Sequence, residues 1–289
     1  MAHRTNSQLK IDATFSQRGR TGHTDWIDVL DLPGTISKDA PRYSARYIVA
    51  LAMRLCRGLL ARFIKSKQLR LKLLRQYRSP FGGFDPNLKD LEPPVTILGY
   101  FQTWRNYQWL REQGVVLEVK TSKPSEWFLE TQKELQRQGR VLGLHFRRGD
   151  YVWNPDIGIL STDYYKSAIL TLKAMRVEWD SVWVFSDDKE IKEEEIVKLF
   201  PTSEKVTFVK PPLDSHSFES LSLMSLASAL VIANSTFSWW AATLGLPDKK
   251  IVCPETWFAN LEDPVDLCPP AWIRVKASWA TSKHTMQSG

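Results

Sequence analysis

The sequence has little of what disulfide-rich or exported proteins need. Its 289 residues include three cysteines, Cys56, Cys253 and Cys268, which lie far apart. An odd and scattered set of this kind is typical of reduced thiols. The first twelve residues are polar and lack the apolar run of a signal peptide. We therefore expect a cytoplasmic protein.

Two stretches of the sequence have an unusual charge content. Residues 220–247 carry no charged side chain and are long enough to raise the question of a transmembrane helix. They include six Ser, two Thr and one Asn, so we interpret them as buried α/β core. Residues 40–84 contain eleven Lys or Arg and no Asp or Glu, which leaves 28 basic and 32 acidic residues elsewhere. The net charge of +7 therefore arises locally.

The basic stretch has the spacing of an amphipathic helix over about residues 42–78. Its apolar residues recur three or four positions apart at Ile48, Leu51, Leu55, Leu59 and Phe63. Such a helix packs on its own domain, which we favour, or lies peripherally on an anionic membrane surface. The stretch shows no recognition motif for nucleic acid, and we expect no nucleic-acid partner.

From Arg140 onward, apolar β-rich runs alternate with helix-like segments. The runs are 141–146, 182–185, 206–209, 230–233 and 251–253, and the helical segments are 162–175, 189–200, 218–227 and 236–244. This alternation predicts βαβ units around a mostly parallel sheet. We therefore predict an α/β fold in which a C-terminal domain, residues 140–289, follows a less regular N-terminal domain, residues 1–139, with candidate strands at 8–11 and 95–100. Ligands of such sheets bind outside the carboxyl ends of the strands, so the residues directly after each run are candidates for a site.

The first run ends in the string HFRRGDY, residues 145–151. Two adjacent arginines at the end of a buried strand are costly unless they meet an anion. Because side chains alternate along a strand, His145 and Arg147 share a face and Arg148 points away. A guanidinium suits phosphate oxygens, so we assign Arg147 to a ligand and Arg148 to the scaffold. The alternative is that Arg148 pairs with Asp150, or with another acidic residue, to brace the loop.

A pair of carboxylates, Asp187 and Asp188, follows the second run. One interpretation is that a carboxylate there accepts hydrogen bonds from a purine or a ribose. The other is that Asp187 and Glu190 form a helix-capping pair. The local sequence favours neither.

Small hydroxyl residues follow the fourth run and open a helix at Ser235, Thr236 and Phe237. Free backbone N–H groups and the helix dipole make such a start an anion site. The alternative is an ordinary N-cap.

The sequence also lacks a metal cluster and a nucleotide loop. No group of His, Cys and carboxylates has metal-ligand spacing, and neither a Walker loop nor GxGxxG occurs. Arginine and helix-end amides must then neutralise phosphates, as expected of a sugar-nucleotide transferase whose leaving group is a nucleoside diphosphate. We expect no metal requirement and no cofactor.

The string HFRRGDY, the FSDD at 185–188 and the IANSTFSWWAATLG at 232–245 together resemble the alpha-1,2-fucosyltransferase family in order and spacing. GYFQTWRNY at 99–107 and LKIDATF at 9–15 resemble further segments of that family. The resemblance implies two Rossmann-like domains in the GT-B arrangement. It also implies transfer of L-fucose from GDP-fucose to the 2-hydroxyl of a galactose-containing glycan, with inversion and without a required metal, as in O-antigen-like surface glycan synthesis.

The resemblance carries residue roles to this sequence by position. Arg147 holds the donor β-phosphate, and His145 and one of Asp187 or Asp188 approach the guanine. Ser235, Thr236 and Phe237 offer amides to the phosphate, and Asp150 orients the arginines or lies near the acceptor. The candidate catalytic residues are Arg147, Asp150 and Arg148. The candidate substrate-binding residues are His145, Arg147, Asp187, Asp188, Ser235, Thr236 and Phe237.

The sequence departs from the family pattern at its start. Family members open with a strand and a Gly-rich loop of the type GGLGNQLFQYA, whereas this sequence begins MAHRTNSQLKID. We therefore expect either a misassigned start codon or an incomplete N-terminal domain without the loop that would lie against the donor. In the second case we expect transfer to be weak or absent. The alternatives are a fucosyltransferase with another acceptor, such as a peptide or a chitooligosaccharide, and a degraded, non-catalytic family member that binds nucleotide only.

Overall fold

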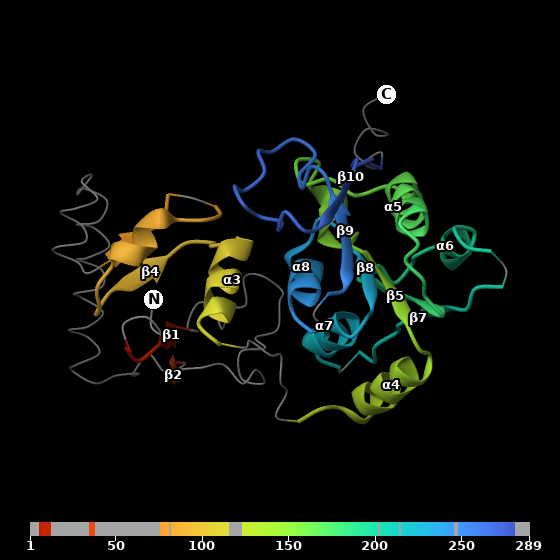
Figure 1. Ribbon diagram of the computed structural model, residues 1–289, viewed down its shortest axis with the longest axis horizontal. Coiled ribbons are helices and arrows are strands. Elements are labelled where there is room, and N and C mark those ends of the chain that lie inside the picture. The colour runs from red at the N-terminus through yellow and green to blue at the C-terminus, as the bar shows by residue number, and fades with distance from the viewer. Residues whose placement is uncertain are drawn as a thin grey trace. The chain divides into compact units, whose positions relative to one another are not determined.

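The computed structural model describes residues 6–12, 35–37, 76–80, 82–115, 123–201, 203–213, 215–245 and 248–280 (Figure 1). The chain divides into two compact units. Unit 1 comprises Met1–Asn106 with Pro264–Leu267, and unit 2 comprises Tyr107–Asp263 with Cys268–Gly289. The sequence places a domain boundary at 139/140 instead. Helix α4 (Glu126–Arg137) falls within unit 2 because its N-cap, Ser125, is hydrogen-bonded to Glu219 of that unit.

Unit 1 contains two small parallel sheets. Strand β1 (Lys10–Asp12) pairs with β2 (Thr35–Ser37), and β3 (Gln76–Arg78) pairs with β4 (Thr96–Leu98). The 3-10 helix η2 spans Pro86–Asp90, and helix α3 (Trp104–Glu112) crosses the boundary between the units. The strands predicted at 8–11 and 95–100 are confirmed as β1 and β4.

The predicted basic helix over 42–78 is wrong for its last three residues. They form strand β3, because their backbone finds hydrogen-bonding partners in the parallel pairing with β4. The remainder of the predicted helix, and with it the predicted membrane contact, lies outside the described residues.

Unit 2 is built on a six-stranded parallel sheet. Its strands are β5 (Val141–Phe146), β6 (Ser181–Ser186), β7 (Val206–Phe208), β8 (Ala229–Val231), β9 (Lys250–Pro254) and β10 (Ile273–Val275). Their order is β10-β9-β8-β5-β6-β7. Counted from β5 as the first strand, this is the 3-2-1-4-5-6 order of a doubly wound fold, and the order reverses between β5 and β8. The predicted α/β class with a parallel sheet is confirmed.

Helices cover both faces of this sheet. They are α5 (Thr162–Ala174), α6 (Glu193–Val197), α7 (Ser217–Ser225) and α8 (Thr236–Thr243). Figure 1 shows α5 and α6 on one side of the strands, and α7 and α8 on the other. Both faces of β5 are therefore buried, which explains its unbroken apolar run. The predicted helix over 189–200 is wrong in length. Helix α6 begins at Glu193 after Lys192, so neither Asp187 nor Glu190 caps it.

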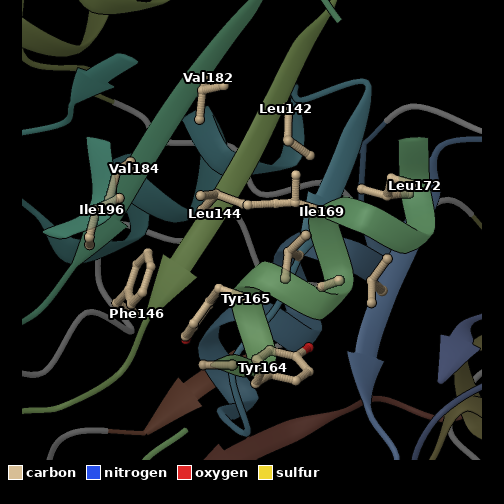
Figure 2. Close-up of a cluster of buried hydrophobic side chains, with 14 of the residues drawn as sticks. Leu142, Leu144, Phe146, Tyr164, Tyr165, Ile169, Leu172, Val182, Val184 and Ile196 are labelled. Atoms are coloured by element: carbon tan, nitrogen blue, oxygen red, sulfur yellow. The ribbon is translucent and has the colours of Figure 1, made fainter. Parts of the chain in front are cut away.

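The hydrophobic core between α5 and the sheet includes residues near the carboxyl ends of the two central strands, β5 and β8. Leu142, Leu144 and Phe146 alternate along β5 and face α5 (Figure 2). From α5, the hydroxyl of Tyr165 donates to the carbonyl of His145 at 2.8 Å, and the hydroxyl of Tyr164 donates to the carbonyl of Ile232 at 2.8 Å. The first bond lies at the end of β5 and the second just after β8.

Among the helices that the structure describes, none has both the length and the apolar character that a membrane crossing requires. The described part of the uncharged stretch, residues 220–245, contains most of α7 together with β8 and α8.

Candidate functional site

The candidate residues gather at the point where the strand order reverses. His145, Arg147 and Arg148 lie at the end of β5, and Ser235 follows β8, its immediate neighbour in the sheet. Asp187 follows β6, on the other side of β5. The carboxyl ends of adjacent strands at such a point form the crevice in which doubly wound proteins bind ligands.

The guanidinium of Arg147 is held by two carboxylates. Its Nη1 lies 2.8 Å from Asp187 Oδ2, and its Nη2 donates to Asp150. The ring of Tyr151 lies beneath it, 5.0 Å from the guanidinium carbon. Its buried Nε has no hydrogen-bond partner among the described residues. Arg147 therefore presents a positive group with one unused donor at the edge of the sheet.

Asp187 braces the loop that carries both arginines. Its Oδ1 accepts the backbone N–H of Arg148 at 2.8 Å, while its Oδ2 pairs with Arg147. A Cβ on Gly149 would lie 2.3 Å from Asp187 Oδ2, so the close approach of this carboxylate needs a glycine there. Both oxygens of Asp187 are engaged within the protein.

Arg148 lies on the other face of the strand, as the alternation along β5 predicts. Its guanidinium lies 5.8 Å from the centroid of the Phe146 ring, and that ring stacks on Tyr165 of α5 at 3.8 Å. Its Nη1 is 3.8 Å from Asp188 Oδ2, a long ion pair. The structure thus gives Arg148 an acidic partner after β6, whereas Asp150 pairs with Arg147.

His145 is almost wholly buried, with 3% of its surface exposed, and its ring lies 5.6 Å from that of Phe237 on α8. Burial and, second, the positive charge of Arg147 lower the pKa of His145 to about 3, so the imidazole is neutral near pH 7. Its Nδ1 has no partner among the residues described. An unpaired buried polar atom is costly, and a ligand that bonded it would remove that cost.

The start of α8 carries the second part of the site. Ser235 is the N-cap, and its Oγ accepts the backbone N–H of Phe237 at 3.3 Å. The N–H of Ser235 donates to the Ala233 carbonyl at 2.8 Å. Two of the three amides assigned to a phosphate, those of Ser235 and Phe237, therefore have protein partners here, and Thr236 begins the helix between them. The first turn has no acidic residue that would oppose an anion.

Tyr151 lies against Arg147 and was missed by the sequence reasoning. It stands in the 3-10 helix η3 (Asp150–Trp153), and the centroid of its ring lies 5.0 Å from the guanidinium carbon of Arg147. Burial raises the pKa of its phenol, an effect that the charge of Arg147 partly opposes. Its place directly after Asp150 in the string HFRRGDY was the available signal.

Within the described part of the chain, no group of three or more His, Cys, Asp or Glu residues could hold a metal ion. The absence of a metal requirement stays a prediction. What the arrangement can do chemically is bind an anion, because a guanidinium with an unused donor and a helix start follow two adjacent strands, β5 and β8.

The strand order and the arginine at its point of reversal place unit 2 among Rossmann-like α/β domains. The chain belongs to a particular family of these proteins: the model of glycosyl transferase family 11 matches residues 96–275. This finding agrees with the resemblance drawn from the motifs.

Two curated relatives from Escherichia coli are similar in sequence. One, an O-antigen biosynthesis glycosyltransferase named WbnK, is 34% identical over 148 residues, which is 50% of this chain and 47% of the relative. The other, an alpha-1,2-colitosyltransferase, is 31% identical over 188 residues, or 63% of each chain. This chain therefore spans about half to two thirds of the length of these relatives.

Solved structures similar to this chain include a fucosyltransferase, NodZ. NodZ from Bradyrhizobium has a TM-score of 0.46 at 13% identity, over 84% of both chains. POFUT1 in complex with GDP-fucose has a TM-score of 0.37 at 15% identity, over 58% of this chain and 56% of that one.

Proposed function

We propose that this chain transfers L-fucose from GDP-fucose to the 2-hydroxyl of a galactoside, with inversion, during synthesis of a surface glycan such as an O-antigen. Membership of glycosyl transferase family 11 supports the glycosyltransferase class. The relative that acts in O-antigen biosynthesis and the relative that is an alpha-1,2-transferase support the process and the linkage. The proposal includes a GT-B arrangement and a cytoplasmic location.

The observation that carries this proposal is the pair of unpaired, buried nitrogen atoms at the end of β5. Arg147 Nε and His145 Nδ1 both lack partners among the described residues, and the His145 ring lies 5.6 Å from that of Phe237 in the first turn of α8. A nucleoside diphosphate leaving group carries the negative charge and the hydrogen-bonding groups that such a crevice would satisfy.

The residue roles follow from the present partners of each group. Arg147 would hold the β-phosphate, and an oxyanion arriving there would compete with Asp150 or Asp187 for the guanidinium. Asp150 is the partner more easily released, because its side chain is 62% exposed, whereas that of Asp187 is 24% exposed and also holds the Arg148 amide. Once released, Asp150 would stand free beside the reacting groups.

The guanine base of the donor would lie nearer to His145 and Asp188 than to Asp187. Both oxygens of Asp187 are already engaged, whereas the Asp188 carboxylate has, among the described residues, a long ion pair and one hydrogen bond, from the N–H of Glu190 at 2.9 Å. Ser235 and Thr236 would contribute the start of α8 to the phosphates. Arginine and helix amides would stabilise the leaving diphosphate without a metal.

Two measurements on the full chain test this function. GDP at a hundred times its dissociation constant should raise the melting temperature by about 5–10 °C, because a ligand that binds only the folded state stabilises it. ADP should raise it less. Release of GDP from GDP-fucose should then depend on an added galactoside. No shift with GDP, or a shift that ADP matches, would remove the donor assignment.

A second candidate concerns the sugar that is transferred. One relative is a colitosyltransferase, and nothing in the described phosphate-binding residues distinguishes two sugars on the same nucleotide. Presenting GDP-fucose and GDP-colitose side by side, with the same galactoside, identifies the donor. A chain that binds GDP tightly and turns over neither donor would instead be a nucleotide-binding, non-catalytic family member.

A further inference from the structure

One aromatic side chain lies against the central arginine of the anion site. Tyr151 stands four residues after Arg147 in the chain, with the centroid of its ring 5.0 Å from the guanidinium carbon. Tyr151 is half-buried and belongs to η3, which follows β5.

We propose that Tyr151 is a positioning residue for donor binding, which holds the Arg147 guanidinium in place through the face of its ring. This inference rests on the proposed function, because it concerns how the same site grips a nucleoside diphosphate. It assigns a role to a side chain that neither the motif spacing nor the comparisons single out.

The geometry explains why an aromatic ring suits this task. The carboxylates of Asp150 and Asp187 hold Arg147 through its terminal nitrogen atoms, so an incoming phosphate must compete with them for the same donors. The ring of Tyr151 attracts the cation through its π-face instead and uses none of the guanidinium donors. Its support for Arg147 therefore persists when a phosphate displaces a carboxylate.

The protonation state of the hydroxyl group also matters for this role. Burial raises the pKa of the phenol, and it therefore stays neutral and keeps its hydrogen near pH 7. A phenolate would pair with Arg147 directly and would compete with the ligand for its charge.

Two substitutions in the full chain separate ring from hydroxyl. Tyr151→Phe keeps the ring, and Tyr151→Leu removes it. We expect Tyr151→Leu to weaken GDP binding, measured by calorimetric titration, by about tenfold, and Tyr151→Phe by no more than about threefold. Tyr164→Phe is the matched control, because it removes one buried phenol hydrogen bond, to the carbonyl of Ile232, from the α5 face of the sheet. It should lower the melting temperature and leave GDP affinity within about twofold of the parent.

A double-mutant cycle with Arg147→Gln tests whether Tyr151 acts through Arg147. If it does, adding Tyr151→Leu to Arg147→Gln should change GDP affinity by less than about twofold, because the cation that the ring supports is already gone. The same tenfold loss in both backgrounds would overturn the proposal, and so would an equal loss in Tyr151→Phe and Tyr151→Leu. A parent chain that binds no GDP would overturn the proposed function itself, an outcome distinct from GDP binding that is indifferent to Tyr151.

Discussion

Replacing Asp187 by asparagine should destabilise unit 2 measurably, because this carboxylate serves two arginines at once. Its Oδ2 pairs with Arg147 Nη1 at 2.8 Å, and its Oδ1 accepts the N–H of Arg148 at 2.8 Å. Asparagine keeps the shape and one acceptor but turns an NH2 group toward a guanidinium donor. Hydrogen bonds to charged groups contribute about 1.5–3 kcal/mol. The side chains of Arg147 and Asp187 are 22% and 24% exposed, so solvent weakens this only in part, and we expect a loss of about 2 kcal/mol.

The neighbouring residue provides a matched control. The side chain of Asp188 is 25% exposed, close to the value for Asp187, and its ion pair with Arg148 is long at 3.8 Å. Its other oxygen accepts the N–H of Glu190, a bond that the carbonyl of asparagine retains. Asp188→Asn should therefore cost less than about 1 kcal/mol.

Urea denaturation of the three proteins, followed by tryptophan fluorescence, gives the free energies of unfolding, provided that the m-values agree. The same proteins should be titrated with GDP and ADP. Asp187→Asn should weaken the binding of GDP and of ADP to the same extent. Asp188→Asn should reduce the preference for GDP over ADP. Equal losses of stability in the two variants, or a loss below about 0.5 kcal/mol in Asp187→Asn, would refute the assignment of Asp187 as the brace.

Four further predictions concern the same unit. Arg147→Lys should lower kcat/KM by about 2–4 kcal/mol in free-energy terms, because a point charge cannot replace a planar donor fork, and Arg148→Lys should lower it less. Equal turnover by Arg147→Lys and the parent would contradict the assignment of Arg147 to the β-phosphate. Saturating EDTA should leave transfer unchanged in the GDP-release assay, and loss of activity that Mn²⁺ restores would show a metal site. The pKa of His145 is about 3 in the folded chain and near 6.5 when unfolded, so its contribution to stability is complete above pH 6.5 and is lost as pH falls toward 3. Between pH 7.5 and 5 the parent should thus lose about 2 kcal/mol more than His145→Gln, and identical pH slopes in urea denaturation would contradict this. Glu219 is fully buried and accepts hydrogen bonds from the N–H of Ser125 at 2.7 Å and from its hydroxyl at 2.8 Å. Glu219→Ala should therefore cost about 2–3 kcal/mol of stability, and Glu219→Gln should cost less. A loss below about 0.5 kcal/mol in Glu219→Ala would mean that α4 does not depend on this cap.

Much of the local structure of unit 2 could be predicted because it follows from residue patterns that extend over only a few positions. All five apolar runs proved to be strands. The central strands β5 and β8 are buried on both faces, which requires an unbroken apolar run. Helix α4 and strand β10 are among the elements that escaped this reasoning. Helix α4 has a wide polar surface, and only its N-cap, Ser125, and the buried pair Phe128 and Leu135 mark it. Strand β10 has three residues and finds its place only by pairing with β9.

The sequence by itself determined the α/β class, the order of elements along the chain, and the gathering of arginines, carboxylates and a helix start at strand ends. These features depend on neighbours within a few residues, and alternation along one strand was enough to separate Arg147 from Arg148. Only the tertiary structure decided which strands are adjacent. The pairing of β5 with β8 brings Arg147 and Ser235 together across more than eighty residues of chain, and no local pattern encodes that choice. The partners of each charge were decided in the same way. Asp150 and Asp187 are equally plausible partners for Arg147 in a linear sequence, whereas packing places both against its guanidinium and sets Tyr151 beneath it.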